Sequence, residues 1–222
     1  MARPRNADGQ RTRQAILDAA LDLFAEKGFF GTSLRDVAGA VGVRESALYN
    51  YFSSKDALFD ALLSAQQDSR LEQLAPLADG PIDDGRAVLL RLATATLGGY
   101  VEPRAQKLFR ILTSDGIRLA KSGRLNLYER MGHSRERLHE ILRRLMRDGW
   151  LRRADPTLLA IAFVSPLVTW RQLHAIDADL PMIKNPRAFA RQHVDQFLLG
   201  AARSGSTGRR ASRRTVSRRR PS

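Results

Sequence analysis

The sequence contains no cysteine among its 222 residues. Disulfide bonds, thiolate metal sites and cysteine nucleophiles are therefore excluded, although the absence says little about the redox environment. The sequence also lacks any run of eighteen or more uncharged apolar residues, and its first thirteen residues are charged without an apolar segment. Neither a membrane span nor a signal peptide is expected, so the predicted location is the cytoplasm, with no membrane partner.

Sequence motifs of the common enzyme classes are missing as well. The chain has no G-x-S-x-G elbow, no P-loop and no G-x-G-x-x-G segment. None of its four histidines has the i, i+4 or H-E-x-x-H spacing of a metal site: His133, His139, His174 and His193. We therefore expect no catalytic residues, no metal and no cofactor.

Acidic residues are scarce at the two chain ends, and most of the net charge of +14 therefore comes from these ends. Residues 203–222 hold eight arginines and no acid, and residues 1–13 hold four arginines and one aspartate, so the remaining chain is close to neutral. The Arg/Ser-rich tail cannot bury enough apolar surface to fold, and we expect both it and a basic arm at residues 1–9 to be disordered. The tail is either a solubilising extension or a nonspecific tether to DNA or an acidic surface.

No convincing pair of strands is present, so the predicted fold class is all-α. Apolar residues recur at helical spacing between residues 10 and 27, and Gly28 ends that helix. A loop composition at residues 77–85 follows a connector helix of about residues 54–74, and Pro76 is expected to lie beyond its end. Further helices are predicted at residues 84–100, 103–114, 119–148, 156–177 and 186–201.

Residues 31–59 have the pattern of a helix-turn-helix unit. Ser33 and Asp36 form a capping box at the start of a helix that Gly42 ends in a left-handed turn. A second helix of about residues 44–52 follows. Ser53 and Asp56 repeat the capping pattern at the start of the connector.

The second of these helices turns Leu48 and Phe52 inward and leaves a polar, mostly uncharged outer face. Amide, hydroxyl, carboxylate and guanidinium groups can bond base edges in the major groove, and the candidates for base reading are Arg35, Arg44, Glu45, Ser46 and Asn50. Other polar groups suit phosphate oxygens, and these candidates are Thr32, Ser33, Tyr49 and Lys55. Exposed polar helix faces also occur in proteins that bind no DNA, so spacing alone leaves the function open.

The residues of this region resemble the DNA-binding domain of the TetR family of bacterial transcriptional regulators. AILDAALDLFAEKGFFGTSLRDVAGAVGV is similar to the family's first two helices, and ALYNYFSSKDALF to its recognition helix and the following cap. GWLRRADPTLLAIAF and HVDQFLLGAAR resemble later parts of the same family more weakly. One departure is Arg44, which stands where relatives usually have a small hydroxyl that caps the recognition helix.

The resemblance implies an all-α homodimer. Each subunit would have a three-helix DNA-binding head within residues 10–70 and a larger helical domain over residues 71–202 that binds a small molecule and dimerises through its last two helices. For a cavity that is apolar with a few polar groups, the candidate lining residues are Tyr100, Phe109, Leu112, Tyr128, Phe163 and Trp170. For each of these residues an ordinary core is the favoured interpretation over a ligand cavity.

Residues 157–173 are apolar nearly all round, which indicates a helix buried on several sides, with Pro166 inside it. The last helix carries an apolar stripe, and the two helices packed against a second copy would form a four-helix seam. The candidate interface residues are Phe163, Leu167, Phe189, Val194, Phe197 and Leu198. Periodicity favours an ordinary intrachain core equally.

The sequence therefore predicts a ligand-responsive transcriptional regulator, a repressor that binds a near-palindromic double-stranded DNA operator as a homodimer and is released by a small-molecule effector. The alternative is a protein that binds nucleic acid or an acidic surface without sequence preference through its arginine-rich tail.

Overall fold

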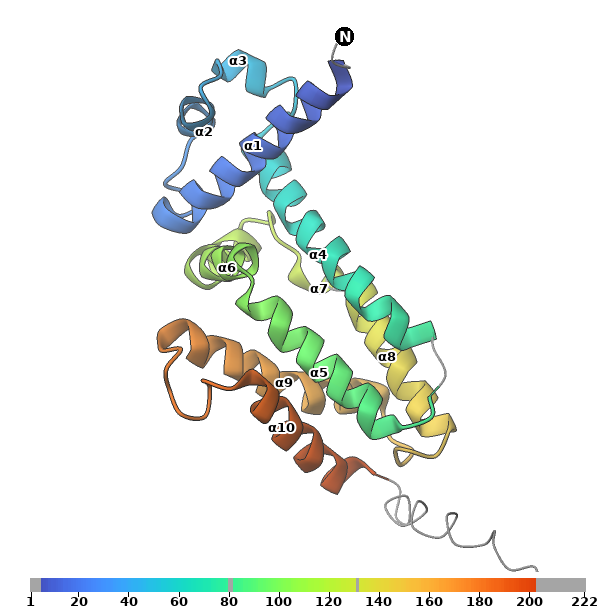
Figure 1. Cartoon of the computed structure of the whole chain (residues 1–222). Coiled ribbons are helices and arrows are strands. Elements are labelled where there is room, and N and C mark those ends of the chain that lie inside the picture. Colours follow the sequence, from blue (N-terminus) through green and yellow to red (C-terminus); the bar gives the residue numbers. More distant parts are fainter. Residues whose placement is uncertain (1–4, 80–81, 131, 203–222) are drawn as a thin grey trace, which may run out of the picture. The chain divides into compact units, whose positions relative to one another are not determined.

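The computed structural model describes residues 5–79, 82–130 and 132–202, and these residues form helices without a strand (Figure 1). The predicted all-α class is confirmed. The helices are α1 (Arg5–Lys27), α2 (Leu34–Val41), α3 (Glu45–Leu48), α4 (Lys55–Asp79), α5 (Gly85–Val101), α6 (Pro103–Lys121), α7 (Leu127–Arg130), α8 (Gly132–Arg147), α9 (Pro156–Ile176) and α10 (Pro186–Ala201).

The chain divides into two compact units. The first unit comprises Met1–Gln73 and Gly98–Ser134, and the second comprises Leu74–Leu97 and Arg135–Ser222. α6 thus packs with the N-terminal helices, although the sequence groups it with the later domain. The functional division into residues 10–70 and 71–202 stays a prediction.

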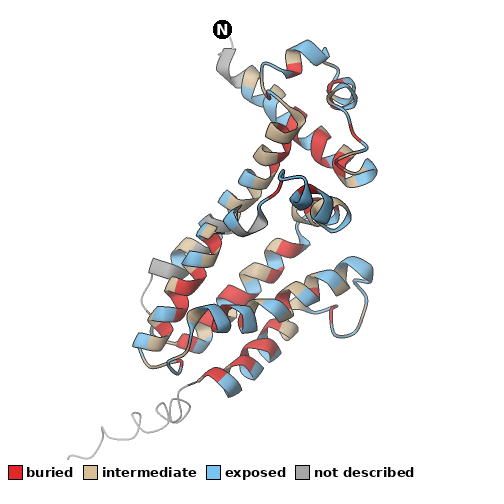
Figure 2. Cartoon of the chain, turned by 180° about the vertical axis from the view of Figure 1, so that it is seen from behind, coloured by how far each residue is buried: buried red, intermediate tan, exposed pale blue. Residues whose placement is uncertain are grey.

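The first unit is built around one hydrophobic core that joins α1, α2, α3, the start of α4 and α6. Phe24, Phe29 and Phe59 meet at its centre, with ring centroids 5.2 to 6.1 Å apart. Leu48 of α3 and Leu108 of α6 belong to the same core. Buried and exposed residues alternate along α1 as an amphipathic helix requires (Figure 2).

In the second unit α9 and α10 run antiparallel. Residues near the start of α9 meet the end of α10, where the backbone N–H of Arg152 donates to Ala201 O at 2.9 Å and Leu151 pairs with Ala202. Farther along the pair, the Phe163 ring lies 5.2 Å from that of Phe197. These aromatic contacts are the centre of the α9–α10 packing.

Several predicted helix bounds are wrong in the structure. α1 begins at Arg5, so residues 5–9 extend a helix instead of forming the expected arm, while residues 1–4 and the expected tail, 203–222, lie outside the described residues. α4 continues through Pro76 to Asp79. The helix that follows Gly42 has only four residues, Glu45–Leu48, before single turns carry the chain to Phe52.

The helix expected at residues 119–148 is three pieces. α6 runs on to Lys121, Gly123 takes a left-handed φ of 72°, and the chain restarts as α7 and α8. Glycine adopts this backbone conformation without steric cost, which explains the break. Apolar periodicity on both sides of the break disguised it in the sequence.

The cap of α4 is one residue later than predicted. Ser54 Oγ accepts a hydrogen bond from the backbone N–H of Ala57 at 3.0 Å, so Ser54, not Ser53, is the capping residue. Asp56 instead forms an ion pair with Arg124, with Arg124 Nε 3.0 Å from Asp56 Oδ1.

α9 is, within the described residues, the helix long and apolar enough to cross a membrane by length and composition. The helix contains Arg171, so the sequence still has no run of eighteen uncharged apolar residues, and one such helix is weak evidence for a membrane span. The same test is passed by core helices, and α9 buries Leu159, Phe163, Leu167 and Trp170 inside the chain. We therefore read α9 as a packing helix of the second unit.

Candidate nucleic-acid interface

α2 is held at both ends by the devices that the sequence predicts. Ser33 Oγ accepts from the N–H of Asp36 at 3.1 Å, and Asp36 Oδ2 accepts from the N–H of Ser33 at 2.8 Å. The Ser33 hydroxyl and, second, the Ser33 backbone N–H donate to the Asp36 carboxylate and lower its pKa, because these hydrogen bonds favour its charged form. At the other end Gly42 has φ 74° and ψ 27°, the left-handed turn that leads into α3.

α3 lacks a side-chain cap. Arg44 stands at the N-cap position and makes no capping hydrogen bond, as the sequence predicts. Leu48 and Phe52 are buried and anchor this segment to the core of the first unit. The inward residues therefore hold the short helix in place, and the outward residues are not needed for its packing.

The outward residues form one exposed polar surface, which we call the α2–α3 surface. It comprises Arg35, Arg44, Glu45, Ser46, Tyr49 and Asn50, all of them exposed. Tyr49 keeps half of its surface accessible, 51%, which is unusual for a large aromatic residue on a folded unit. All five predicted base-reading residues thus lie on a surface open to a partner, where their groups can reach base edges.

Three of the four predicted phosphate contacts, Thr32, Ser33 and Lys55, make hydrogen bonds inside the first unit. Thr32 is 2% exposed, and its hydroxyl makes hydrogen bonds to the carbonyl oxygens of Gly28 at 2.9 Å and Leu23 at 3.2 Å. Phosphate binding by the Thr32 hydroxyl does not fit this geometry. Ser33 is exposed, but its hydroxyl lies 2.6 Å from Asp36 Oδ2 and serves the capping box.

Lys55 is partly buried at the start of α4. Its ammonium donates to the carbonyls of Phe29 at 2.9 Å and Thr32 at 2.8 Å, and lies 4.5 Å from the centroid of the Phe29 ring. Burial lowers the pKa of this ammonium, because a charged group loses hydration there; Asp56 acts in the opposite direction. An ammonium has three donors, so one remains for a phosphate.

One basic residue near this surface was given no role by the sequence analysis. Arg13 of α1 places its guanidinium carbon 5.0 Å from the centroid of the Phe52 ring. The side chain is exposed and stands beside the turn that follows α3. A stacked guanidinium is pre-positioned for an anion, and only the tertiary packing of Arg13 on Phe52 reveals this.

The residues predicted to line a ligand cavity are not gathered in one unit. Tyr100, Phe109 and Leu112 belong to the first unit, whereas Phe163 and Trp170 belong to the second. Phe163 and Trp170 are fully buried core residues, and the side chain of Tyr128 lies outside the described residues. A hollow of about 230 Å³ in the first unit is lined by other residues: Asp18, Leu21, Asp22, Pro103, Arg104 and Lys107.

Four of the predicted dimer residues are intrachain core. Phe163, Leu167, Val194 and Phe197 are 0 to 9% exposed in a single chain, so they cannot also form a surface between subunits. Phe189 and Leu198 are half-buried and stay predictions. The prediction went wrong because helical periodicity marks an apolar face without indicating which neighbour covers it.

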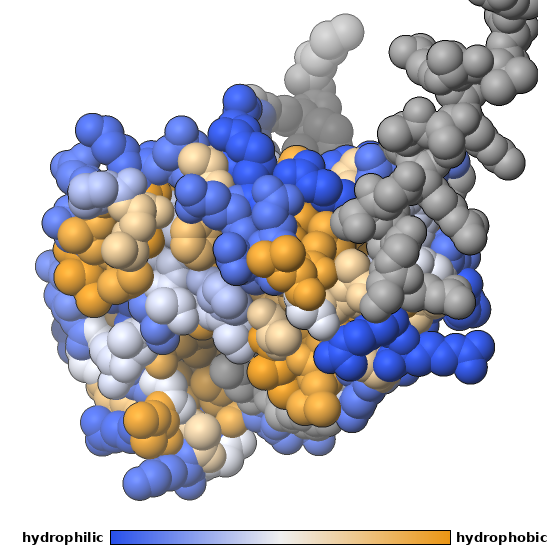
Figure 3. All heavy atoms as spheres, turned by 90° about the horizontal axis from the view of Figure 1, so that it is seen from below, coloured by the Kyte–Doolittle hydropathy of each residue, from blue (hydrophilic) through white to orange (hydrophobic). Residues whose placement is uncertain are grey.

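A different set of apolar residues is exposed on the same two helices. Leu158 and Ile161 of α9 are 65% and 56% exposed, and Leu199 of α10 is 82% exposed. They lie at the end of the pair where the start of α9 meets the end of α10. Exposed hydrophobic side chains also stand among hydrophilic ones in Figure 3.

The sequence matches two family descriptions. Residues 16–62 match "Bacterial regulatory proteins, tetR family", and residues 87–200 match "AefR-like transcriptional repressor, C-terminal domain". The first match contains the α2–α3 surface. The second covers half of the chain and includes α6.

Two curated relatives and two solved structures illustrate the similarity. The chain is 31% identical to the nucleoid occlusion factor SlmA of Escherichia coli (strain K12 / DH10B) over 82% of this chain and 98% of that protein. It is 34% identical to the HTH-type transcriptional regulator AcrR of Shigella flexneri, over 50% of this chain and 53% of AcrR.

The fold resembles a putative TetR-family transcriptional regulator from Mesorhizobium loti, with a TM-score of 0.69 at 22% identity over 90% of this chain and all of the other. It also resembles the TetR-family regulator PfmR from Thermus thermophilus, with a TM-score of 0.62 at 26% identity over 83% of this chain and 97% of the other. Together with the two family matches and the geometry of the head, these similarities show that the chain belongs to the TetR family of DNA-binding transcriptional regulators.

Proposed function

We propose that the protein is a ligand-responsive repressor that binds a near-palindromic operator as a homodimer. The observation that carries the proposal is the α2–α3 surface, where base-reading groups stand exposed on a segment whose inward residues are fixed in the core. A rigid support of this kind presents side chains to a groove at low entropic cost. The match to an AefR-like repressor C-terminal domain supports the sign of regulation.

We assign two roles on this surface. Ser46, Asn50 and Glu45, with Arg35 and Arg44, would read base edges. Tyr49 and the third donor of Lys55 would bind phosphates and set register, and Arg13 joins them as a phosphate contact. Thr32 is withdrawn from direct contact, because its hydroxyl is used within the first unit.

The homodimer would form through α9 and α10 of each copy. The exposed residues Leu158, Ile161 and Leu199 replace the buried residues of the original prediction, since only exposed apolar groups gain from burial against a partner. A twofold dimer presents two heads, which explains why we expect a near-palindromic site with half-sites about one helical turn apart.

The effector would be a small molecule bound outside the α2–α3 surface. SmeT, a protein with a similar fold, forms a complex with triclosan, and this supports a small-molecule effector here. The effector would act by differential affinity, binding better to the state in which the two DNA-binding heads are misaligned for the operator. By thermodynamic linkage, its binding then lowers DNA affinity by the coupling free energy between the two sites, typically about 1 to 3 kcal/mol. The connector α4 is the expected lever.

A second candidate function is a role in nucleoid occlusion, for which this chain would bind the chromosome at many sites. The observation that favours it is the SlmA match, which extends over 98% of that protein, while the AcrR match covers 53% of AcrR. The arginine-rich tail suits the more general alternative of binding without sequence preference.

Selection of bound fragments from the source genome separates these functions. The repressor proposal predicts a few fragments that share one near-palindromic sequence upstream of genes. Many dispersed fragments with a shared sequence would favour the nucleoid role instead. Enrichment of fragments without any shared sequence would contradict both functions. It would favour binding to DNA through charge alone.

A further inference from the structure

α6 is built into the first unit together with the DNA-binding helices. Leu108, Ile111 and Leu119 of α6 are buried in the same hydrophobic core as Phe29 and Leu48. The family match that covers α6 is nevertheless the C-terminal one, residues 87–200. The compact structure that supports the α2–α3 surface therefore includes a helix from outside the sequence-defined head.

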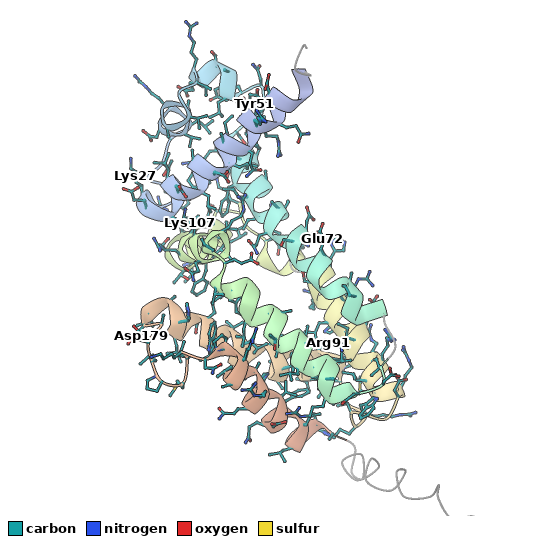
Figure 4. All side chains as sticks on the ribbon, viewed as in Figure 1. Lys27, Tyr51, Glu72, Arg91, Lys107 and Asp179 are labelled. Carbon is teal, nitrogen blue, oxygen red and sulfur yellow. The ribbon has the colours of Figure 1, made fainter. Side chains whose placement is uncertain are left out.

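Charges of opposite sign face each other between α1 and α6. Arg104 Nη1 lies 2.8 Å from Asp18 Oδ1, and Lys107, labelled in Figure 4, forms an ion pair with Asp22. Each of these pairs is largely exposed, so each contributes little by itself. They accompany the apolar packing of α6 on α1, and the far end of α6 lies at the loop after α1.

At that far end, α6 holds the loop of residues 28–32, which joins α1 to α2. Asp115 Oδ2 accepts a hydrogen bond from the backbone N–H of Phe29 at 2.7 Å. Gly28 has φ 78°, and a Cβ built on it would lie 2.9 Å from the same oxygen. Arg118 stacks on the other aromatic residue of the loop, with its guanidinium carbon 3.8 Å from the centroid of the Phe30 ring.

The same loop supplies both carbonyl acceptors of Lys55. Lys55 Nζ donates to Phe29 O and Thr32 O, so the position of the ammonium depends on the position of the loop. Ser33, the cap of α2, follows the loop directly. Any movement of residues 28–32 is passed on to both Lys55 and α2.

We propose that Asp115 is a positioning residue for DNA binding. By accepting the Phe29 N–H, it fixes the loop that sets the start of α2 and the site of the Lys55 ammonium. The inference goes beyond the family assignment, because it gives a role at the DNA-binding surface to a residue of α6 that touches no DNA.

A purely electrostatic role and a positioning role of Asp115 predict opposite changes in DNA affinity when the residue is replaced. Removing a carboxylate from a DNA-binding unit reduces repulsion by phosphates, so charge alone predicts tighter binding in Asp115→Ala. Positioning predicts weaker binding, by about tenfold, since a hydrogen bond to a charged acceptor is lost. Asp115→Asn lacks the charge but keeps an acceptor oxygen, and is expected to bind at least as tightly as the unmodified protein.

The measurement is fluorescence anisotropy of a labelled duplex enriched from random DNA by the unmodified full chain, over a series of salt concentrations. Asp195→Asn is the matched control, because Asp195 is an exposed, ion-paired acid of the second unit. It should leave the affinity unchanged. The slope of log K against log salt should be less steep in Asp115→Ala than in the unmodified protein, because a displaced loop moves the Lys55 ammonium away from its phosphate contact.

Tighter or equal binding by Asp115→Ala would overturn the proposal, and so would an equal loss in Asp115→Asn. Thermal unfolding checks that the variants are folded. If Asp115→Ala does not fold, Asp115→Glu serves, since it keeps the charge and misplaces the carboxylate: it should bind more weakly than the unmodified protein, which has the same charge, and equal or tighter binding would refute the role. If no duplex is enriched, the operator proposal fails, and the comparison is made on a mixed-sequence duplex.

Discussion

At the residue scale, the segment that carries the α2–α3 surface has two kinds of side chain. Buried side chains anchor it to the core, and exposed side chains are available to DNA. Leu48 and Phe52 are buried, while Tyr49 and Asn50 between them are exposed. The capping box of Ser33 and Asp36 fixes α2 without any help from DNA. Substitutions on the exposed side should therefore change binding without changing stability.

Base-reading and phosphate-binding residues should differ in what their loss changes. Asn50→Ala or Ser46→Ala should alter which base pairs are preferred, at a cost of about 1 to 3 kcal/mol for the original site. Tyr49→Phe or Lys55→Gln should weaken binding to all sequences, and Lys55→Gln, which removes a positive charge, should also flatten the salt dependence. Sequencing of duplexes bound from a randomised pool distinguishes the two, and the same change of preference in all four variants would refute the division of roles.

The stability of the second unit should depend on pH through His193. Burial lowers the pKa of this imidazole, although the Nε2 hydrogen bond to Phe163 O, at 2.8 Å, opposes the effect. In the unfolded chain the histidine has its ordinary pKa of about 6.5. Below that pH the unfolded chain therefore binds more protons than the folded chain, and the free energy of unfolding falls as the pH drops.

Thermal unfolding of the unmodified protein and of His193→Gln between about pH 7 and 5 measures this dependence. The variant should show a flatter dependence, because the group that titrates differently is gone. His133→Gln, at an exposed position, is the control and should keep the slope of the unmodified protein. An identical slope in His193→Gln would contradict the assignment.

At the element scale, α9 and α10 divide their apolar residues between an inner and an outer face. Phe163 and Phe197 pack edge to face within the chain, with ring centroids 5.2 Å apart, while Leu158, Ile161 and Leu199 are exposed. The inner face accounts for the stability of the pair. The outer face is available to a second copy.

Charges on the outer face should break the dimer without unfolding the chain. Leu158→Glu combined with Ile161→Glu should raise the dimer dissociation constant about a hundredfold or more, because an unpaired buried carboxylate costs several kcal/mol. Phe163→Ala should instead lower the free energy of unfolding by about 3 to 5 kcal/mol. Analytical ultracentrifugation measures the first effect, with Gln106→Glu on α6 as control; a dimer that survives the double substitution contradicts this interface.

The sequence predicts local structure well where the cause is local. The capping box, the left-handed turn at Gly42 and the uncapped Arg44 depend on residues within four positions of each other, and all were predicted. The buried state of Thr32 and the clamp by Asp115 could not be predicted, because they depend on contacts formed by tertiary packing. The inner face of α9 was misassigned for the same reason.

At the scale of the whole molecule, we expect nonspecific DNA affinity and sequence specificity to come from different parts of the chain. Residues 203–222 carry eight of the 37 basic residues and no acid, whereas the α2–α3 surface is mixed in charge. Charge attracts any phosphate backbone, and base contacts select a sequence. We expect the tail to add affinity without adding specificity.

Truncation after Ala202 should lower DNA affinity at low salt and leave the preferred sequence unchanged, because the tail contributes counterion release only. The slope of log K against log salt should become less steep. The truncated chain keeps the backbone hydrogen bond from Arg152 N–H to Ala201 O, so the end of α10 stays in place. A changed consensus after truncation would refute the tether.

The central claim is that two copies of the α2–α3 surface bind one near-palindromic operator, and footprinting of a selected genomic fragment with a parallel count of bound chains tests it most directly. The account predicts two protected half-sites about one helical turn apart, with an even number of chains per site. Protection that spreads along the fragment without fixed edges, or one chain bound to one half-site at full affinity, would contradict it.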